Sequence, residues 1–419
     1  MLLKSTIYIF KYSSYSVTIM KGPFSIWAVF GLTIVIDLLT HVYHPKKYHR
    51  INPYNPVREV SLVVPVHKEP TEYIEETILS LNKERYPLKN IIVCGDLESK
   101  ETEKVIKKLS EDFKNLFYLE SPYVSKARKI NYTVENSKDI LGEFVYVRDC
   151  RVTGEIDCIE KMVSYFSHKS VSAVTSYGRV SIPRNFLSRS YFYGKTWINE
   201  VGRFRKNAQE KRRAVFVICG ASTMFRTDVL KKIPIPHGSK TEDTHYTWLL
   251  QEEGYNIRVA DDATVSSPEI DGPGLEGIKL QIKQSYRWST GTMQCLFRER
   301  ERIFKSKRLA YSTLLPGFLE SLMYTIPLIL LPLFFFIYPV FALGFLIGDT
   351  VFSLLGTLII IPKKFPKTLF HYPQILFFKY LNAIIFLCAI ATVTTQAAVS
   401  RRDKWYNEWF PPRTKYEEI

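Results

Sequence analysis

The distribution of apolar residues constrains this chain more than any other feature of its sequence. Residues 312–361 are almost unbroken hydrocarbon apart from three prolines, and further apolar stretches lie at 22–43 and 374–399. A helix of about 20 apolar residues crosses the hydrocarbon core of a bilayer, so the longest stretch exceeds one span. We therefore predict membrane helices at 22–43, 318–337, 340–361 and 374–399, and a multi-pass integral protein of the plasma membrane.

The segments that flank these stretches bear on orientation. Residues 1–21 are too polar to span a bilayer and lack a small-residue cleavage site, so we expect an interfacial segment. Basic residues cluster at 46–58 directly after the first helix, which predicts that the next domain is cytosolic. Four crossings would put both termini outside, whereas the basic tail at 400–419 favours the cytoplasm. Either all four segments cross, or one is re-entrant or interfacial.

Three acidic residues lie within the apolar stretches: Asp37, Glu320 and Asp349. A charge in lipid is costly, so we expect these side chains to face the protein interior or a water-filled channel. Two interpretations follow. The acids line a duct for a polymer, or they make contacts between packed helices.

The net charge restricts the classes of partner. Lys and Arg number 57 against 41 Asp and Glu, a net charge of +16, which suits nucleic acid, an anionic membrane surface or phosphorylated substrates. No basic run is interleaved with aromatics as in nucleic-acid modules, so we expect the lipid bilayer and phosphorylated substrates as partners and no nucleic acid. The six cysteines form no CxxC pair, which favours ordinary reduced cysteines in a cytosolic domain.

The middle of the chain has the alternating pattern of an α/β domain. Short β-branched runs at 60–66, 91–94 and 144–147 are typical of buried parallel strands, and 71–83 has a helical pattern between the first two. A fourth strand is expected at 171–175 and an aromatic-rich helix at 186–204. Polar residues at the ends of such strands meet at one edge of the sheet, where ligands bind. We predict a mostly parallel sheet within a domain at 55–306.

Two motifs in this domain carry candidate chemistry: the triplet TED at 241–243 and the pentad QSYRW at 284–288. In a helix, positions 284, 287 and 288 lie on one face because they are spaced i, i+3 and i+4. Arg287 can bind a phosphate with two hydrogen bonds, Trp288 offers a flat face to a sugar ring, and Gln284 can donate to either. The alternative is an amphipathic interfacial helix with a buried tryptophan and an arginine that reaches solvent.

Together the motifs resemble those of the membrane-integrated family 2 glycosyltransferases, the group of hyaluronan, chitin and cellulose synthases. The resemblance covers residues 60–292 and implies a GT-A-like cytosolic domain flanked by transmembrane helices. It implies that Asp243 is the catalytic base. The nucleotide-binding residues it implies are Pro65, Val66, Glu69, Asp96, Lys126, Asp149 and Arg151. The residues it implies for the acceptor and the diphosphate are Gly220, Ala221, Ser222, Glu242, Gln284, Arg287 and Trp288.

The chain departs from this family at the metal motif. Family members carry Asp-x-Asp, whereas this chain has Asp149-Cys150-Arg151. An arginine cannot coordinate a metal and would repel one. Three interpretations remain open: Arg151 replaces the metal as a fixed cation, Asp149 holds Mg²⁺ or Mn²⁺ with help from other residues, or activity has been lost.

The resemblance implies an inverting, processive glycosyltransferase that uses a nucleotide sugar, expected to be UDP-linked, to elongate a β-linked glycan at the cytosolic membrane face, with possible coupling to export. One alternative is single addition to a lipid acceptor such as a polyprenyl phosphate, and another is an inactive membrane scaffold. The membrane domain is expected at 312–399. Trp409 and Arg413 in the tail are loosely similar to the gating segment of hyaluronan synthases.

Overall fold

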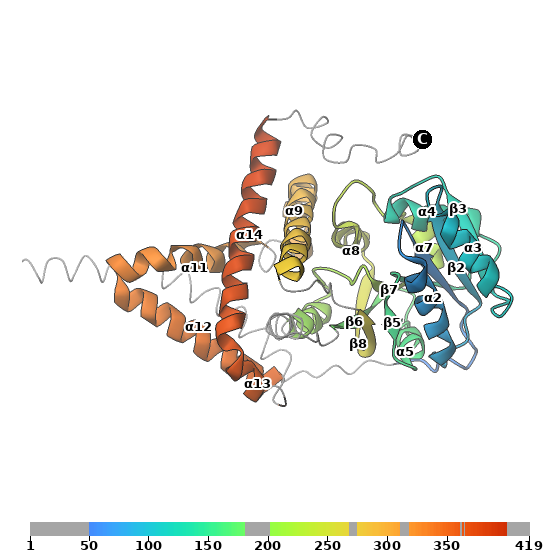
Figure 1. Ribbon diagram of the computed structural model, residues 1–419, viewed down its shortest axis with the longest axis horizontal. Helices are drawn as coiled ribbons and strands as arrows, with labels where there is room; N and C mark the ends of the chain where they lie inside the picture. Colours follow the sequence, from blue (N-terminus) through green and yellow to red (C-terminus); the bar gives the residue numbers. More distant parts are fainter. Residues whose placement is uncertain are drawn as a thin grey trace, which may run out of the picture.

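The computed structural model of the chain describes residues 50–180, 202–267, 275–310, 318–360, 363 and 365–399. The predicted interfacial segment at 1–21, the first membrane helix at 22–43 and the tail at 400–419 lie outside the described residues. So does most of the helix predicted at 186–204. The described part has a domain built on one sheet, with a group of long helices beside it (Figure 1).

The sheet has eight strands in the order β3-β2-β1-β4-β7-β6-β8-β5. The first four are parallel neighbours: β3 (Leu116–Ser121), β2 (Asn90–Asp96), β1 (Val60–Pro65) and β4 (Phe144–Arg148). Beyond them, β7 (Ser222–Arg226) runs antiparallel to both β4 and β6 (Val171–Val180). β8 (Asn256–Ser267) is parallel to β6, and β5 (Thr153–Gly154) is antiparallel to β8. The sheet is therefore mixed, and the prediction of a mostly parallel sheet holds for its first half.

The central strands form where the sequence places its apolar runs. Every residue of β1, β2 and β4 is buried, as expected for strands covered on both faces. Successive side chains of β1 point to opposite faces, so Leu62 and Val64 join one core cluster and Val63 joins the other. The strand predicted third, at 144–147, is the fourth along the chain. β3 was not predicted because it lies at the sheet edge and its residues are mostly half-exposed or exposed.

Helices cover both faces of the sheet. The first half of the domain contributes α2 (Thr71–Ser80), the short helix η1 (Leu81–Lys83), α3 (Lys100–Leu109), α4 (Lys126–Asn136) and α5 (Cys158–Ser164). The second half contributes α7 (Thr227–Lys232) and α8 (Glu242–Glu252). The helix predicted at 71–83 is confirmed as α2 and η1. Since α8 begins directly after Thr241, the TED triplet lies at a helix start.

The carboxyl-terminal third forms long helices. These are α9 (Leu275–Lys305), α10 (Lys307–Leu309), α11 (Glu320–Ile337), α12 (Pro339–Ile360), α13 (Phe365–Phe370) and α14 (Tyr372–Val399). α11, α12 and α14 match the three apolar segments predicted in this region. By length and composition, one helix among the described residues, Tyr372–Ala398, is long and apolar enough to cross a membrane. α11 and α12 contain shorter apolar stretches, Thr325–Ile337 and Pro339–Leu355, so four crossings stay a prediction.

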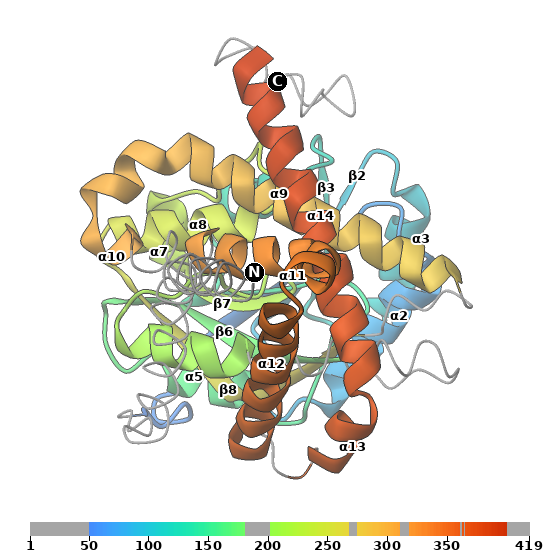
Figure 2. The ribbon, with the colours of Figure 1, turned by 90° about the vertical axis from the view of Figure 1, so that its left-hand side faces the viewer.

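Helix α9 lies between the sheet domain and the apolar helices. α14 crosses it (Figure 2), while α11 and α12 extend away from the domain (Figure 1). The Tyr286 hydroxyl bonds to Thr392 on α14 at 2.8 Å. Trp248 of α8, Met293 of α9 and Val393 of α14 belong to one buried cluster, so the apolar helices are joined to α8 through α9.

Asp349 lies at a contact between α12 and α14. Its carboxylate accepts hydrogen bonds from Lys379 at 3.1 Å and from the Tyr372 hydroxyl at 3.0 Å. Lys379 also donates to Ser353 at 2.7 Å. Asp349 is buried, which agrees with the expectation that it faces the protein interior. The contacts correspond to the helix-packing interpretation.

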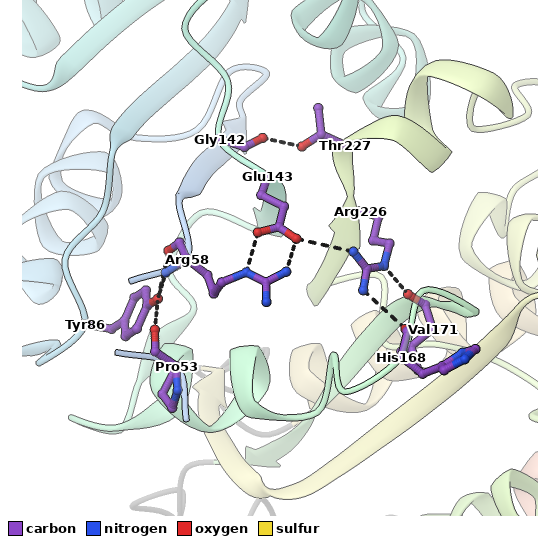
Figure 3. Close-up of polar contacts among 9 residues, drawn as sticks. All are labelled: Pro53, Arg58, Tyr86, Gly142, Glu143, His168, Val171, Arg226 and Thr227. Carbon is purple, nitrogen blue, oxygen red and sulfur yellow. Dashed lines mark hydrogen bonds and ion pairs between the residues drawn. The ribbon is translucent and has the colours of Figure 1, made fainter. Parts of the chain in front are cut away.

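A charged cluster closes the edge of the sheet where β1 and β4 begin, hereafter the amino edge (Figure 3). Glu143 bonds Arg58 through both of its oxygens and Arg226 at 3.4 Å. Arg226 also donates to the carbonyls of Val171 at 2.8 Å and His168 at 3.2 Å. This cluster ties β1, β4, β6 and β7 together at the edge opposite to the strand ends discussed next.

Candidate active site

The candidate site lies where β1, β2 and β4 end, hereafter the carboxyl edge. β1 is followed by the loop His67–Pro70, β2 ends at Asp96, and Asp149 directly follows β4. The parallel register of β1 with its two neighbours brings these three strand ends side by side. This is the edge at which open α/β sheets bind ligands.

Asp96 is the centre of a saturated hydrogen-bond cluster. Its Oδ2 bonds Lys129 at 2.6 Å and His67 Nδ1 at 2.7 Å, and its Oδ1 accepts from the Ser99 hydroxyl at 3.0 Å. Asp96 and Lys129 are almost completely buried. Burial alone raises the pKa of Asp96, but the hydrogen bond and charge of Lys129 reverse this and lower it, with help from His67 and Ser99. The sequence analysis identified Asp96 but not its contact with Lys129.

The loop after β1 is held by the same cluster. The Val66 amide donates to the Cys94 carbonyl at 3.0 Å, and the Val66 carbonyl accepts from Lys129 at 2.5 Å. Glu69 accepts a hydrogen bond from the His67 amide, and burial raises the pKa of its carboxyl group. Pro65 pairs within the sheet beside Cys94. The predicted nucleotide residues of this loop therefore lie together next to Asp96.

Lys126 joins two groups of residues that the sequence analysis predicted separately. Its ammonium forms an ion pair with Asp149 and donates to the Gly220 carbonyl at 2.7 Å. The Asp149 amide donates to the Ala221 carbonyl at 3.0 Å. Burial lowers the pKa of Lys126, but Asp149, Glu242 and Asp243 together raise it above its usual value. The nucleotide residues at 126 and 149 and the acceptor residues at 220 and 221 therefore form one site.

The approach of Asp243 leaves little room for a side chain at position 220. A Cβ atom built on Gly220 would lie 2.8 Å from Asp243 Oδ2, closer than real Cβ contacts. The Gly220 amide donates to that same oxygen at 3.2 Å, and Oδ1 accepts from the Thr244 amide at 2.8 Å. The carboxylate is thus fixed by backbone donors at the start of α8. Neighbouring Glu242 has a pKa raised by burial, with Lys126 opposing the shift.

Ser222, the third predicted acceptor residue at 220–222, has its hydroxyl buried within the sheet. It bonds the Tyr146 hydroxyl at 2.7 Å and the Ser176 hydroxyl at 2.6 Å. These contacts use the side chain to join β4, β6 and β7. A part for Ser222 in acceptor binding stays a prediction.

Helix α9 packs closely on the start of α8. A Cβ atom on Gly291 would lie 2.7 Å from Thr241 Cγ2 and 3.0 Å from its backbone nitrogen, so a larger residue would separate the helices. Two turns farther along α9, Glu299 pairs with His245 at 2.9 Å. The sequence analysis missed both contacts. They fix α9 relative to Asp243.

The QSYRW residues lie on α9 just before Gly291. Positions 287 and 288 are one turn away from it, on the face that continues toward α8. Trp288 is 43% exposed and Arg287 is also exposed, so both side chains are accessible to a ligand. The Gln284 Oε1 atom is buried and has no hydrogen-bond partner among the described residues. A buried acceptor without a partner is costly, so this atom suits a ligand donor.

Comparison with known proteins decides the family. The profile described as "Glycosyltransferase like family 2" matches residues 56–291, more than half of the chain. The chain belongs to this family. The family confirms the prediction of a glycosyltransferase, while the bounds of the domain expected at 55–306 stay a prediction.

Similar family 2 proteins include the poly-beta-1,6-N-acetyl-D-glucosamine synthases of staphylococci. The Staphylococcus aureus protein (strain COL) is 27% identical over 245 residues, 57% of this chain and 56% of that protein. The Staphylococcus epidermidis protein (strain RP62A) is 28% identical over 263 residues, 61% and 59% of the two chains. The chain therefore matches less than two thirds of the length of these relatives.

Structural comparison supports a GT-A-like fold for this family 2 domain. The mannosyltransferase PcManGT of Pyrobaculum calidifontis, solved with GDP-mannose and Mn²⁺, has a TM-score of 0.60 at 15% identity. The match covers 87% of this chain and 98% of that one. At this identity the likeness concerns the fold.

The residues of this family 2 site do not fit the divalent metal that the usual motif implies. In nucleotide sites Mg²⁺ is held by one or two carboxylates together with phosphate oxygens and waters, and the described residues contain no group of three or more His, Cys, Asp or Glu side chains that could hold a metal by themselves. Where the metal was predicted, Asp149 is bonded to the Lys126 ammonium. Arg151 replaces the second carboxylate.

Arg151 is held by α2 and adopts a rare backbone conformation. Its φ of 69° lies in the left-handed region, which residues other than glycine, asparagine and aspartate seldom adopt. Its guanidinium carbon lies 3.6 Å from the centre of the Tyr73 ring, a cation–π contact, and its amide donates to Thr77 at 2.7 Å. The structure thus stacks Arg151 on Tyr73, a partner that the sequence analysis did not identify.

A completely buried ion pair lies at the end of β4, directly before Asp149. Arg148, the residue before it, pairs with Glu84, and the side chains of both are at most 1% exposed. Arg148 also donates to the Tyr146 hydroxyl at 3.2 Å. A Cβ atom on Gly154 would clash with both partners, so glycine is needed there. Arg148 and Glu84 are 64 residues apart in the sequence, so no local sequence pattern indicated that they pair.

Proposed function

We propose that this chain is an inverting, processive glycosyltransferase that elongates a β-linked glycan from a UDP-sugar at the cytosolic face of the membrane. UDP-N-acetylglucosamine is the first donor to test, because the matched staphylococcal relatives are poly-beta-1,6-N-acetyl-D-glucosamine synthases. The membrane-integrated subtype and coupling to export are parts of this proposal. They are supported by the apolar helix Tyr372–Ala398 and by the two apolar helices beside it.

The observation that carries the proposal is the fixed carboxylate of Asp243. Backbone donors from Gly220 and Thr244 hold it beside the loop that also bonds Lys126. A carboxylate so placed can accept a proton from an acceptor hydroxyl. Gly220 leaves room there because it has no side chain.

The proposed reaction is a single displacement at the anomeric carbon. The acceptor oxygen forms a bond to that carbon as the carbon–oxygen bond to the diphosphate breaks, and the bonding electrons leave with the diphosphate. The acceptor proton passes to Asp243. Lys126 and Arg287 supply positive charge for the leaving group. Because these charges are in place before the reaction begins, they lower the barrier to transfer. Trp288 offers its exposed ring to the acceptor sugar.

The arrangement of α9 supports a polymerising enzyme. α9 contacts α8, which carries Asp243, and also α14, the helix most suited to span a bilayer. A glycan that leaves the acceptor site along α9 would therefore reach the apolar helices. Gating of this path by the tail at 400–419 is part of the proposal.

The test uses the full chain purified in lipid nanodiscs with radiolabelled nucleotide sugars. We expect incorporation from UDP-N-acetylglucosamine into a product of many sugars, resolved by gel electrophoresis and digested by a β-N-acetylglucosaminidase. A product with one sugar on a polyprenyl phosphate would favour single addition. No incorporation from UDP-, GDP- or TDP-sugars would favour an inactive scaffold and contradict the proposal.

A further inference from the structure

The first turn of α4 has the wrong charge for a helix start. It contains Lys126, Arg128 and Lys129 and no acidic residue. The amino-terminal end of a helix carries partial positive charge, so cations there are unfavourable and anions are favourable. A first turn with three cations therefore costs stability in the free protein. It suits a bound anion such as a diphosphate.

The three cations have different surroundings. Lys129 is buried against Asp96 at 2.6 Å, and Arg128 lies over the Tyr123 ring at 5.2 Å. Lys126 instead points to the strand end of β4, where it pairs with Asp149 and bonds the Gly220 carbonyl. Its side chain is 27% exposed, so a ligand can reach it. An ammonium has three N–H donors, and these two acceptors leave one for a phosphate oxygen.

Lys126 is an ammonium at neutral pH, because the ordinary pKa of a lysine side chain is about 10.4. Its ion pair with Asp149 and its hydrogen bond to the Gly220 carbonyl hold this charge at the end of β4. The ammonium is thus a permanent positive charge at the position beside Asp149 where the usual motif would hold a metal.

We propose that the ammonium of Lys126 takes the place of the divalent metal, so that this enzyme binds a nucleoside diphosphate sugar and transfers its sugar without a metal ion. The proposal rests on the proposed function. Asp149 would position the ammonium, and Lys126 would donate to the diphosphate as negative charge develops on it. Lys126 keeps its proton throughout, while the proton of the acceptor passes to Asp243.

Arg151 is less suited to this part. Its guanidinium is stacked on the Tyr73 ring, with its carbon 3.6 Å from the ring centre. The left-handed backbone at Arg151 also suits aspartate better than arginine. Arg151→Asp is therefore a feasible route to a second carboxylate at this position.

The experiment measures UDP and Mn²⁺ binding to the full chain in nanodiscs. Calorimetry should give the same UDP affinity, within about twofold, in EDTA and in Mn²⁺. Electron paramagnetic resonance should show no Mn²⁺ that becomes bound when UDP is added. Lys126→Ala should weaken UDP binding in EDTA by about 10- to 100-fold, the loss expected for one hydrogen bond to a charged group. Lys126→Arg should retain most of the affinity.

Two further variants make the result specific. Lys108→Ala, which removes an exposed lysine on α3, is the matched control and should bind UDP as the wild type does. Lys126→Ala combined with Arg151→Asp should acquire Mn²⁺-dependent UDP binding. If Lys126→Ala fails to fold, the wild-type comparison in EDTA and Mn²⁺ still decides.

The outcomes separate the two proposals. Wild-type UDP binding or sugar transfer that requires Mn²⁺ would overturn the assignment of Lys126 and leave the proposed function in place. Failure to bind any nucleoside diphosphate, with or without Mn²⁺, would overturn the proposed function as well.

Discussion

The two edges of the central sheet hold clusters of charged residues that differ in how completely they are satisfied. At the amino edge, Glu143 lies between Arg58 and Arg226, and backbone carbonyls accept hydrogen bonds from the other two guanidinium nitrogens of Arg226 (Figure 3). At the carboxyl edge, Lys126 pairs with Asp149 while the charges of Glu242 and Asp243 also act on it, and Gln284 Oε1 has no partner within the described part of the chain.

This difference indicates which charges serve the fold and which are available to a ligand. A charged side chain whose partners are all protein groups mainly contributes to stability, because a ligand would have to break those bonds. A charge in excess, or a buried polar atom without a partner, is costly in the free protein and gains on binding. The amino edge is therefore expected to affect unfolding, and the carboxyl edge to affect catalysis.

The largest effect is expected for Asp243→Asn. The amide keeps the shape of the side chain but cannot accept the acceptor proton, so the transfer rate should fall by about 10²–10⁴-fold. UDP affinity and the melting temperature should stay close to those of the wild type. Transfer rates come from the radiolabel assay and UDP affinity from calorimetry. A rate within threefold of the wild type would remove Asp243 from the mechanism.

Asp96→Asn tests what determines the role of a charged residue. The role could depend on how completely protein groups satisfy its hydrogen bonds, or on which edge of the sheet it occupies. Asp96 lies at the carboxyl edge but is as saturated as Glu143, and its loss leaves Lys129 buried without a counter-charge. We expect the free energy of unfolding to fall by about 2–4 kcal/mol. If nucleotide binding depends on Asp96 directly, as the sequence analysis predicted, UDP affinity measured below the unfolding temperature will fall too.

The pH dependence of this effect has a definite sign. Because the pKa of Asp96 is lowered in the folded state, its ionised form adds stability above the unfolded pKa of about 3.9. That stability is lost as pH falls below this value through the folded pKa. The difference in unfolding free energy between wild type and Asp96→Asn should therefore be constant near neutrality and shrink below about pH 4. A difference that grows toward acid pH would contradict the role of Lys129.

Much of the parallel half of the fold was predictable because its signals are local. The runs at 60–66, 91–94 and 144–147 are β-branched and buried on both faces, so composition alone identifies them. β3 gave no such signal, because it contains no β-branched residue and only its two end residues are buried, as suits a strand at the sheet edge. The antiparallel direction of β7 depends on its pairing with Phe144–Arg148, far away in sequence, which no local pattern encodes.

The acidic residues of the site could be predicted from the sequence, but most of the residues that bond to them could not. Asp96, Asp149 and Asp243 follow strands or begin a helix, positions that sequence patterns locate. Their partners come from other elements: Lys129 is 33 residues from Asp96, and Gly220 is 23 residues from Asp243. The stacking of Arg151 on Tyr73 likewise depends on how α2 packs.

Glu143→Ala tests the amino edge. The change removes the shared partner of Arg58 and Arg226, but Glu143 is 36% exposed, so water replaces part of the lost interaction. We expect a loss of about 1–2 kcal/mol in unfolding free energy, measured by denaturant titration. Transfer per folded molecule should be unchanged, with Lys89→Ala, at a more exposed pair with Glu59, as the control. A reduced transfer rate at full folding would show that the two edges are coupled.

The smallest effect is expected for Trp288→Ala, which sharpens the comparison within the carboxyl edge itself. Trp288 is exposed on α9, so its removal should change the melting temperature little. The stacking of one aromatic ring is worth about 0.5–1.5 kcal/mol, so acceptor affinity should fall by about 2- to 12-fold. Shorter products are then expected, because a weakly held chain dissociates between additions. UDP affinity should be unchanged, since the ring contacts the acceptor and not the nucleotide.

Phe304→Ala, at another exposed aromatic on α9, is the matched control. If calorimetry showed that Trp288→Ala abolished UDP binding while product length stayed the same, Trp288 would belong to the nucleotide site, and the acceptor would have to lie elsewhere along α9.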